Sequence, residues 1–200
     1  MKNILLTLSL LLGVCTASAQ LIKEKAPVET KYLTGAVPVV DGKVTFSCDI
    51  PVRCKMSQDT LFLHIHRWLS NTYNMRGVLK YADLGSNREQ KVHIVGVNEY
   101  IVFKQKAFVL DRSQMIYRLT IQQEQGNLHV TMTDISYYYE EERDPVKLTA
   151  EEWITDENAL SEDKRDLVRR HGKFRIQTID LFDEITSYLA SFMADLAQKQ

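Results

Sequence analysis

The sequence predicts an α+β fold in which one antiparallel sheet carries its helices on a single face. Several segments alternate apolar and polar residues with the period of a half-buried strand, and they follow one another with no helix between them. Two other segments, one near the start and one at the C-terminus, gather their apolar residues on one side of a helix. We therefore expect both helices to cover the apolar face of the sheet and leave the polar face to solvent.

Length and composition limit the classes of protein to which the chain can belong. Its 200 residues suit one domain with an appendage, and 44% hydrophobic residues is typical of a globular protein. The 25 basic and 26 acidic side chains give a formal net charge of -1. This balance provides no electrostatic reason to expect nucleic acid as a partner.

Residues 1–19 have the pattern of a secretory signal peptide. A basic residue precedes an apolar run over residues 4–14, and small side chains stand at Ala17 and Ala19. The run is shorter than the roughly 20 residues that a membrane-spanning helix needs. We expect cleavage between Ala19 and Gln20 and an exported protein, periplasmic or extracellular, with no stable membrane insertion after cleavage.

The three cysteines have different expected roles. Cys15 raises the alternative of a lipoprotein signal, but Val14 is larger than the residue expected before a lipidated cysteine, so we expect no lipid anchor. Cys48 and Cys54 remain in an oxidising compartment, where cysteines often pair. Five residues separate them, and an extended strand would hold them too far apart unless the chain turns back. The sequence leaves two alternatives for Cys48 and Cys54: a disulfide, or two free thiols.

Residues 20–41 are expected to form an N-terminal tail, and residues 42–200 a single domain. The domain opens with an alternating strand over residues 44–50. A helix is expected from Ser57, a good N-cap residue, to about Asn74.

Four strand signals follow this helix. Gly96 interrupts the second of them and suggests a β-bulge. The third and fourth are joined by a hairpin turn that contains Gly126. The four signals cover residues 78–81, 92–103, 117–122 and 128–133.

Residues 140–177 are expected to form an acidic insertion with short helices before the last helix. A capping box at Thr149 begins one short helix. Ser161 begins a second, which the glycine at Gly172 would end. Thr178 is then expected to cap the long C-terminal helix.

Five stretches carry a resemblance to known proteins: Lys31–Pro38, Asp41–Phe46, Glu152–Leu160, Gly172–Arg175 and Thr178–Asp180. They resemble a family of secreted proteins from Gram-negative bacteria, domain of unknown function 4468. The resemblance implies an envelope location and a fold like that of the TATA-binding protein (TBP-like), and it offers no catalytic residue to transfer. The predicted order of elements, β-α-β-β-β-β-α, is also that of the TBP-like fold, and we expect a helical C-terminal extension in addition.

Two surface features are candidates for ligand binding. Tyr137, Tyr138 and Tyr139 end the last strand signal, and aromatic side chains are favoured in binding surfaces. The simpler interpretation is that they pack beneath the acidic segment. The second feature is the polar face of the hairpin, which includes Arg118 and His129. The simpler interpretation of this face is a solvated antiparallel sheet.

The sequence indicates no catalytic residue, metal ligand or cofactor. His64 and His66 lie on opposite borders of the apolar stripe of their helix, so they cannot share one metal ion. We expect a non-catalytic module that binds an envelope protein, a glycan or a small ligand. The alternative is a hydrolase or other enzyme with an unfamiliar site, which should show a pocket where titratable groups with shifted pKa values converge.

Mass spectrometry of the exported chain is expected to find Gln20 as its first residue, because signal peptidase reads the small side chains before it. A lipid on Cys15 would contradict this expectation.

Overall fold

The computed structural model describes residues 27–199 except 107–108 and 140–145. The expected signal peptide and its cleavage site therefore lie outside the described residues, together with Cys15, Ala19 and Gln20.

One antiparallel sheet of six strands forms the centre of the protein. Its spatial order is β3-β7-β6-β5-β4, and β8 also pairs with β7. β3 and β8 lie end to end along one edge of β7. At the other edge, β4 pairs only with residues 95–98 of the long strand β5. The strands are β3 (Phe46–Pro51), β4 (Lys80–Asp83), β5 (Val92–Lys106), β6 (Val109–Glu124), β7 (Asn127–Tyr139) and β8 (Val146–Thr149).

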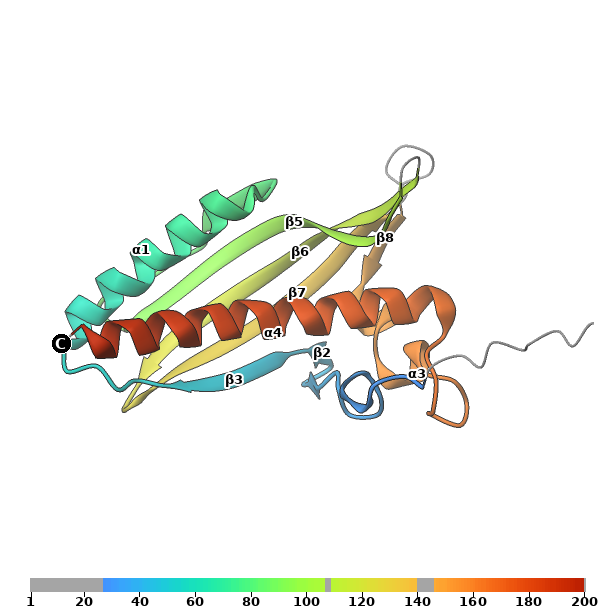
Figure 1. The fold of residues 1–200 in the computed structure, drawn as a ribbon, viewed down its shortest axis with the longest axis horizontal. Helices are drawn as coiled ribbons and strands as arrows, with labels where there is room; N and C mark the ends of the chain where they lie inside the picture. The colour runs from blue at the N-terminus through green and yellow to red at the C-terminus, as the bar shows by residue number, and fades with distance from the viewer. Residues whose placement is uncertain (1–26, 107–108, 140–145, 200) are drawn as a thin grey trace, which may run out of the picture.

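Two long helices, α1 (Gln58–Arg76) and α4 (Arg169–Gln198), cover the same face of this sheet (Figure 1). The hydroxyl of Ser57 caps α1, and Gly77 ends the helix in a left-handed conformation that favours glycine. The predicted α+β fold with its helices on one face is confirmed. No helix in the described part of the chain is long and apolar enough to cross a membrane.

The core lies between the sheet and the two helices. Alternate residues of β6 and β7 point towards the helices and are buried, as the period of two predicts. Burial of each such side chain contributes about 1.5–3 kcal/mol. Fully or almost fully buried examples are Leu119, Ile121, Leu128, Val130 and Met132 from the strands and Ile65 and Leu69 from α1.

The predicted start of the last helix is wrong, because α4 begins at Arg169 rather than near Thr178. Gly172 lies inside this helix, where a Cβ atom would come within 2.6 Å of the Leu167 side chain. The glycine therefore permits close packing and does not end a helix. The Thr178 hydroxyl donates to the carbonyl of Phe174 within the same helix.

The expected acidic insertion also contains a strand, β8. The capping box at Thr149 begins α2 (Ala150–Trp153), as predicted. α3 (Asp156–Ala159) comes before Ser161, so the short helix expected from Ser161 to Gly172 is wrong.

The expected N-terminal tail is folded from residue 27 onwards. It contains η1 (Thr30–Tyr32) and a short hairpin of β1 (Val39–Val40) and β2 (Lys43–Val44). Tyr32 is buried, and its hydroxyl donates to Asp180 of α4 at 2.7 Å. This part of the chain belongs to the domain because its apolar side chains pack against the C-terminal helix.

The guanidinium group of Arg175 joins three segments that are distant in the sequence. Arg175 lies on α4 and is 0% exposed. It donates to the carbonyls of Tyr32 and Leu33 at 2.7 and 2.6 Å, and to the carbonyl of Ile154 at 2.8 Å. The carboxylate of Asp156 accepts a further bond at 2.6 Å. η1, α2 and α3 are thereby fixed to α4.

Replacement of Arg175 by methionine is expected to lower the free energy of unfolding by about 3 kcal/mol or more, because three buried carbonyls and Asp156 lose their donor. Urea unfolding followed by circular dichroism measures this loss. The control is Arg169→Ala at the exposed start of the same helix, with an expected change within about 0.5 kcal/mol. Equal stability of the two variants would contradict the role of Arg175.

Candidate binding surface

The face of the sheet opposite α1 and α4 carries two neighbouring rows of side chains across β4, β5 and β6. Lys80, Asn98 and Ile116 are register partners in the first row. The second row contains Ala82, Gly96 and Arg118. We call this side of the sheet the helix-free face, since every described helix packs on the other side.

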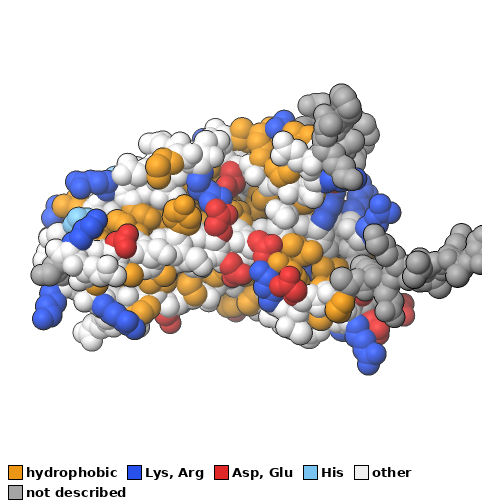
Figure 2. Space-filling model, viewed as in Figure 1, with side chains coloured by type: hydrophobic (Ala, Val, Ile, Leu, Met, Phe, Trp, Pro, Cys, Tyr) orange, Lys and Arg blue, Asp and Glu red, His pale blue; other side chains and the backbone are white. Residues whose placement is uncertain are grey.

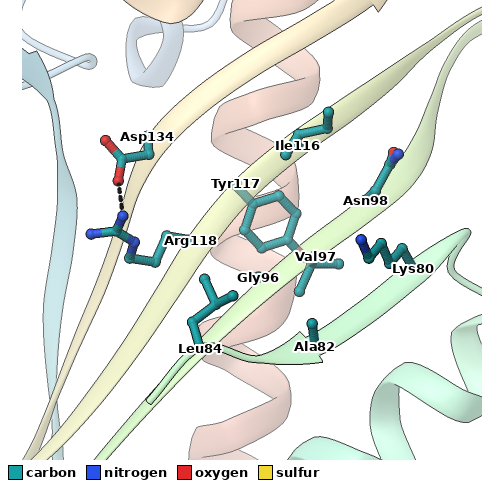
Figure 3. Close-up of a pocket in the computed structure, with 10 residues that line it drawn as sticks. All are labelled: Lys80, Ala82, Leu84, Gly96, Val97, Asn98, Ile116, Tyr117, Arg118 and Asp134. Atoms are coloured by element: carbon teal, nitrogen blue, oxygen red, sulfur yellow. Dashed lines mark ion pairs between the residues drawn. The ribbon is translucent and has the colours of Figure 1, made fainter. Parts of the chain in front are cut away.

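These two rows line a hollow of about 410 Å³ on the helix-free face. Figure 3 shows the hollow from this side, with the ribbon of α4 passing behind the strands. Its volume falls within the range of small-molecule sites, about 300–1,000 Å³. Leu84, Val97, Tyr117 and Asp134 complete the lining.

Gly96 shapes the floor of the hollow. A Cβ atom on this residue would lie 3.0 Å from the Cδ1 atom of Leu84, which is 53% exposed. The glycine thus lets Leu84 lie close over the strand. Gly96 pairs in regular register with Ala82 and Arg118, so the predicted bulge at this position is wrong.

An irregularity between β6 and β7 positions the charged side of the hollow. The register shifts between Ile116 and Arg118, and Asp134 opposite has a positive φ of 54°. Bulges of this kind redirect a side chain. The carboxylate of Asp134 forms an ion pair with the guanidinium of Arg118 at 2.8 Å (Figure 3). The ammonium group of Lys43 lies 3.7 Å from the same carboxylate group.

Lys80 and Asn98 line the opposite side of the hollow. Within the described residues, the ammonium group of Lys80 has no ion-pair partner. The side-chain nitrogen of Asn98 donates to Gln114 at 2.8 Å. Its Oδ1 atom is buried without a hydrogen-bond partner. Because the protein covers this atom, a ligand in the hollow does not reach it where the side chain lies, and the amide end of Asn98 points away from Lys80 (Figure 3).

Arg118 and His129, the polar residues expected on this face, are both found there, but only Arg118 lines the hollow. His129 lies opposite Asp49 in the pairing of β7 with β3. Its Nδ1 atom is 2.7 Å from the Asp49 carboxylate. His129 thus belongs to a separate polar pair on the same face.

Tyr137 is part of the core, which corrects its expected place in a binding surface. It is 0% exposed, and its hydroxyl is 2.7 Å from the hydroxyl of Thr178 on α4. Its ring packs edge-on against Phe174, with the centroids 5.0 Å apart. Burial raises the pKa of Tyr137 above its ordinary value.

Tyr138 and Tyr139 point to opposite sides of the sheet. Tyr139 packs on the helix side, where its hydroxyl donates to Asp111 at 3.0 Å and accepts from Lys173 at 2.8 Å. Tyr138 is half-buried on the helix-free face, beside Gln114. The tyrosines therefore do not form one surface, and α4 provides the cover for two of them.

Cys48 and Cys54 are free thiols in the structure, and both are half-buried. Cys48 is on the α4 side of β3, the same side as the buried Phe46 and Ile50. Burial raises the pKa of the Cys48 thiol.

A second hollow, of about 270 Å³, lies between α1, α4 and β5. Its buried carboxylate, Glu99, accepts from the hydroxyl of Tyr117 at 2.6 Å and from Arg76 at 2.9 Å. Arg76 also donates to Glu184 at 2.8 Å. Figure 2 shows acidic and basic side chains adjoining on this helix-covered face. Arg76, Glu99 and Glu184 of this hollow are thus bonded to one another, and Asp180 is paired with Lys31.

The pKa shifts in the second hollow follow from this arrangement. Burial alone would lower the pKa of Arg76, but the adjacent carboxylate of Glu99 raises it above its ordinary value. Burial raises the pKa of Tyr117 well above the usual range, with further contributions from Tyr73 and Glu99. Tyr117 therefore remains a protonated donor to Glu99.

His93 is enclosed in the core without a hydrogen-bond partner for either ring nitrogen. Its ring stacks on Phe62 at a centroid distance of 4.0 Å, and the ring of His66 lies 5.9 Å away. Burial, and secondly His66, lower the pKa of His93 to about 4. Across the described ranges, no group of three or more His, Cys, Asp or Glu side chains is arranged to hold a metal ion.

An antiparallel sheet with two long helices on one face and an uncovered opposite face defines a TBP-like α+β protein. The family described as "Domain of unknown function (DUF4468) with TBP-like fold" matches residues 46–138. A crystal structure of a DUF4468 family protein from Bacteroides ovatus is 33% identical, with a TM-score of 0.74, and the match covers 83% of this chain and 95% of that chain. This chain belongs to the DUF4468 family.

A second similar structure shows the fold alone. It is the crystal structure of a TBP-like protein from Parabacteroides distasonis, 18% identical with a TM-score of 0.62, and the match covers 81% of this chain and 97% of that chain. A comparison with curated proteins gave no match.

Sequence reasoning found Arg118 but missed the other residues that give the hollow its chemistry. Lys80 and Asn98 meet across β4 and β5, a pairing that no local pattern encodes. Asp134 depends on the irregular register of β7. One usable signal was the alternation of side chains along the strand predicted over residues 92–103. This alternation places Gly96 and Asn98 on the same face of the sheet.

Acidification is expected to destabilise the fold through His93. Its pKa is about 4 in the folded protein and about 6.5 when unfolded, so the unfolded state binds more protons between these pH values. Above pH 6.5 the contribution of neutral His93 to the free energy of unfolding is fully present. This contribution falls by up to about 3 kcal/mol as the pH approaches 4.

The measurement compares urea unfolding of the wild type and His93→Leu from pH 7 to 4. The variant should gain stability relative to the wild type as the pH falls, since leucine takes up no proton. His64→Gln, a partly exposed histidine of α1, is the control. A constant difference between the wild type and His93→Leu would contradict the prediction.

Proposed function

We propose that this protein is an exported, non-catalytic binding module whose contact surface is the helix-free face of the sheet. The observation that carries the proposal is the hollow on that face. It combines an apolar floor at Gly96 and Leu84 with two cationic side chains, Arg118 and Lys80. Such mixed apolar and polar lining favours ligand binding.

The buried titratable groups on the other side of the sheet support binding rather than catalysis. Both carboxylate oxygens of Glu99 are occupied, one by Tyr117 and the other by Arg76. A general acid or base needs a group that can reach the substrate and exchange a proton with it. Glu99 instead fixes the end of α1 to β5, which is a structural role.

Export is proposed from the sequence of residues 1–19 and from the family resemblance. The partner is then an envelope protein, a glycan or a small ligand. The near equality of acidic and basic side chains, 26 and 25, gives no support for nucleic acid as the partner.

Photo-crosslinking tests whether the helix-free face is the contact surface. Benzoyl-phenylalanine is placed at Thr120, on this face beside Arg118, or at Ser187, an exposed control position on α4. The purified mature chain is irradiated with an envelope extract of the source cells. We expect a discrete adduct only from position 120. Addition of Arg118→Ala should lower the yield of this adduct about fivefold.

Arg118→Ala should leave folding intact, because an exposed ion pair contributes only about 0–1 kcal/mol. Adducts from position 187 alone, or an unchanged yield with Arg118→Ala, would remove the helix-free face from the proposal.

A further inference from the structure

We infer that the flank of β5 over residues 99–102 is a docking site for an extended segment of a partner protein that carries a basic side chain. This docking site is separate from the helix-free face and adds a further contact surface to the protein. Three features of the structure point to it: backbone groups that face outwards at this flank, the hollow between α1, α4 and β5 that borders them, and the excess of negative charge around that hollow.

The first feature is a pair of residues whose backbone groups point away from the sheet. The N–H group of Leu84 donates to the carbonyl of Ile94 on β5 at 2.8 Å. Because an antiparallel strand bonds alternate residues to each neighbour, Tyr100 and Val102 direct their N–H and C=O groups towards the same flank as Ile94. β4 ends opposite Asn98. In the part of the chain that the structure describes, no strand pairs with this flank beyond that point.

The opposite edge of the sheet shows how such a flank is completed. There β3 and β8 lie end to end along β7, and β8 contributes only four residues. At the β5 edge, β4 is the one strand among the described residues. A segment of about the length of β8, placed beyond β4, would give this edge the same cover. The register irregularity after Val102 and the charge of Lys104 set the outer limit of the segment.

The second feature is the hollow of about 270 Å³ along the same stretch. Tyr100, Ile101 and Val102 line it from β5, and Leu181 and Glu184 line it from α4. Directly opposite side chains of an antiparallel pair lie on the same face. An added residue opposite Ile101 therefore points into the hollow, while the residues bonded to Tyr100 and Val102 point to the helix-free face.

The third feature is the charge around the hollow, which favours a basic side chain at that position. Arg76 and Lys31 together face four carboxylates, and acidic side chains gather at the centre of this face (Figure 2). The side chain of Glu184 is 52% exposed, so it can accept a further hydrogen bond. Complementary charge of this kind selects a partner. The four carboxylates are those of Glu99, Asp180, Asp183 and Glu184.

The same charges disfavour a second copy of this chain as the occupant. Two copies joined through their β5 edges would bring two acidic hollows towards each other, and like charges across a strand pair are destabilising. The docked strand is therefore expected to come from a different protein, by the mode in which an extended peptide adds to a sheet edge.

The test uses the capped pentapeptide Val-Thr-Arg-Thr-Val. Its arginine is expected opposite Ile101, and its two threonines opposite Tyr100 and Val102. Binding to the mature chain is followed by backbone amide NMR shifts. We expect the largest shifts at Tyr100 and Val102, because their N–H groups gain an acceptor. Replacement of the arginine by citrulline, which is neutral and similar in shape, should lower the affinity about fivefold.

Methyl groups on the peptide nitrogens test the strand pairing. Methylation of both threonine nitrogens removes the donors aimed at β5 and should lower the affinity about tenfold or more. Methylation of the arginine nitrogen is the matched control, because this nitrogen points away from β5 in an antiparallel pair. It should leave the affinity within about twofold of the parent peptide.

A variant of the protein assigns the charge preference to the hollow. Glu184→Gln should reduce the preference for arginine over citrulline from about fivefold to about twofold. Asp195→Asn is the matched control, since Asp195 is exposed on the same helix about three turns beyond the hollow. It should leave the preference unchanged. Thermal unfolding verifies that both variants are folded.

Equal affinity of the wild type for the arginine and citrulline peptides would overturn the inference. An arginine methylation that weakens binding as much as the threonine methylations would do the same. So would shifts confined to the surroundings of Arg118, no binding of the pentapeptide, or a dimer of the chain alone in which the amides of Tyr100 and Val102 are protected from hydrogen exchange.

Discussion

The buried guanidinium of Arg175 is the interaction on which the arrangement around the sheet depends. An arginine inside a protein is costly unless its donors are satisfied. Here three backbone carbonyls and Asp156 meet that requirement. The same bonds hold the N-terminal segment and the short helices α2 and α3 against α4. These segments therefore lie on the helix-covered side of the sheet together with α4.

Local patterns were sufficient to predict the strands and α1, because each depends on a period that the residues themselves display. They were not sufficient for the start of α4. Gly172 after a run of basic residues has the pattern of a helix end, and Thr178 followed by Asp180 has the pattern of a helix start. In the structure Gly172 packs closely on Leu167 just before the helix, and the Thr178 hydroxyl contacts Tyr137 of β7, which is distant in the sequence.

The same distinction applies to the candidate site. Arg118 could be placed on the helix-free face from strand alternation alone. Its partner Asp134 could not be placed in this way. Simple alternation along β7 would put Asp134 on the helix-covered face, but the irregular register there brings it to the helix-free face. Alternation separates Tyr138 from its two neighbours, but only the position of α4 shows that Tyr137 is sealed within the core.

The short length of β4 has a consequence for the behaviour of the protein in a crowded compartment. β4 covers residues 95–98 of β5, and in the described part of the chain no strand pairs with the same flank of β5 beyond them. An open flank of this kind can recruit a strand from another molecule and begin aggregation. The register irregularity between Val102 and Lys104 interrupts a regular edge there, and the charge of Lys104 discourages pairing. Both features of β5 oppose the addition of a further strand at this flank beyond Val102.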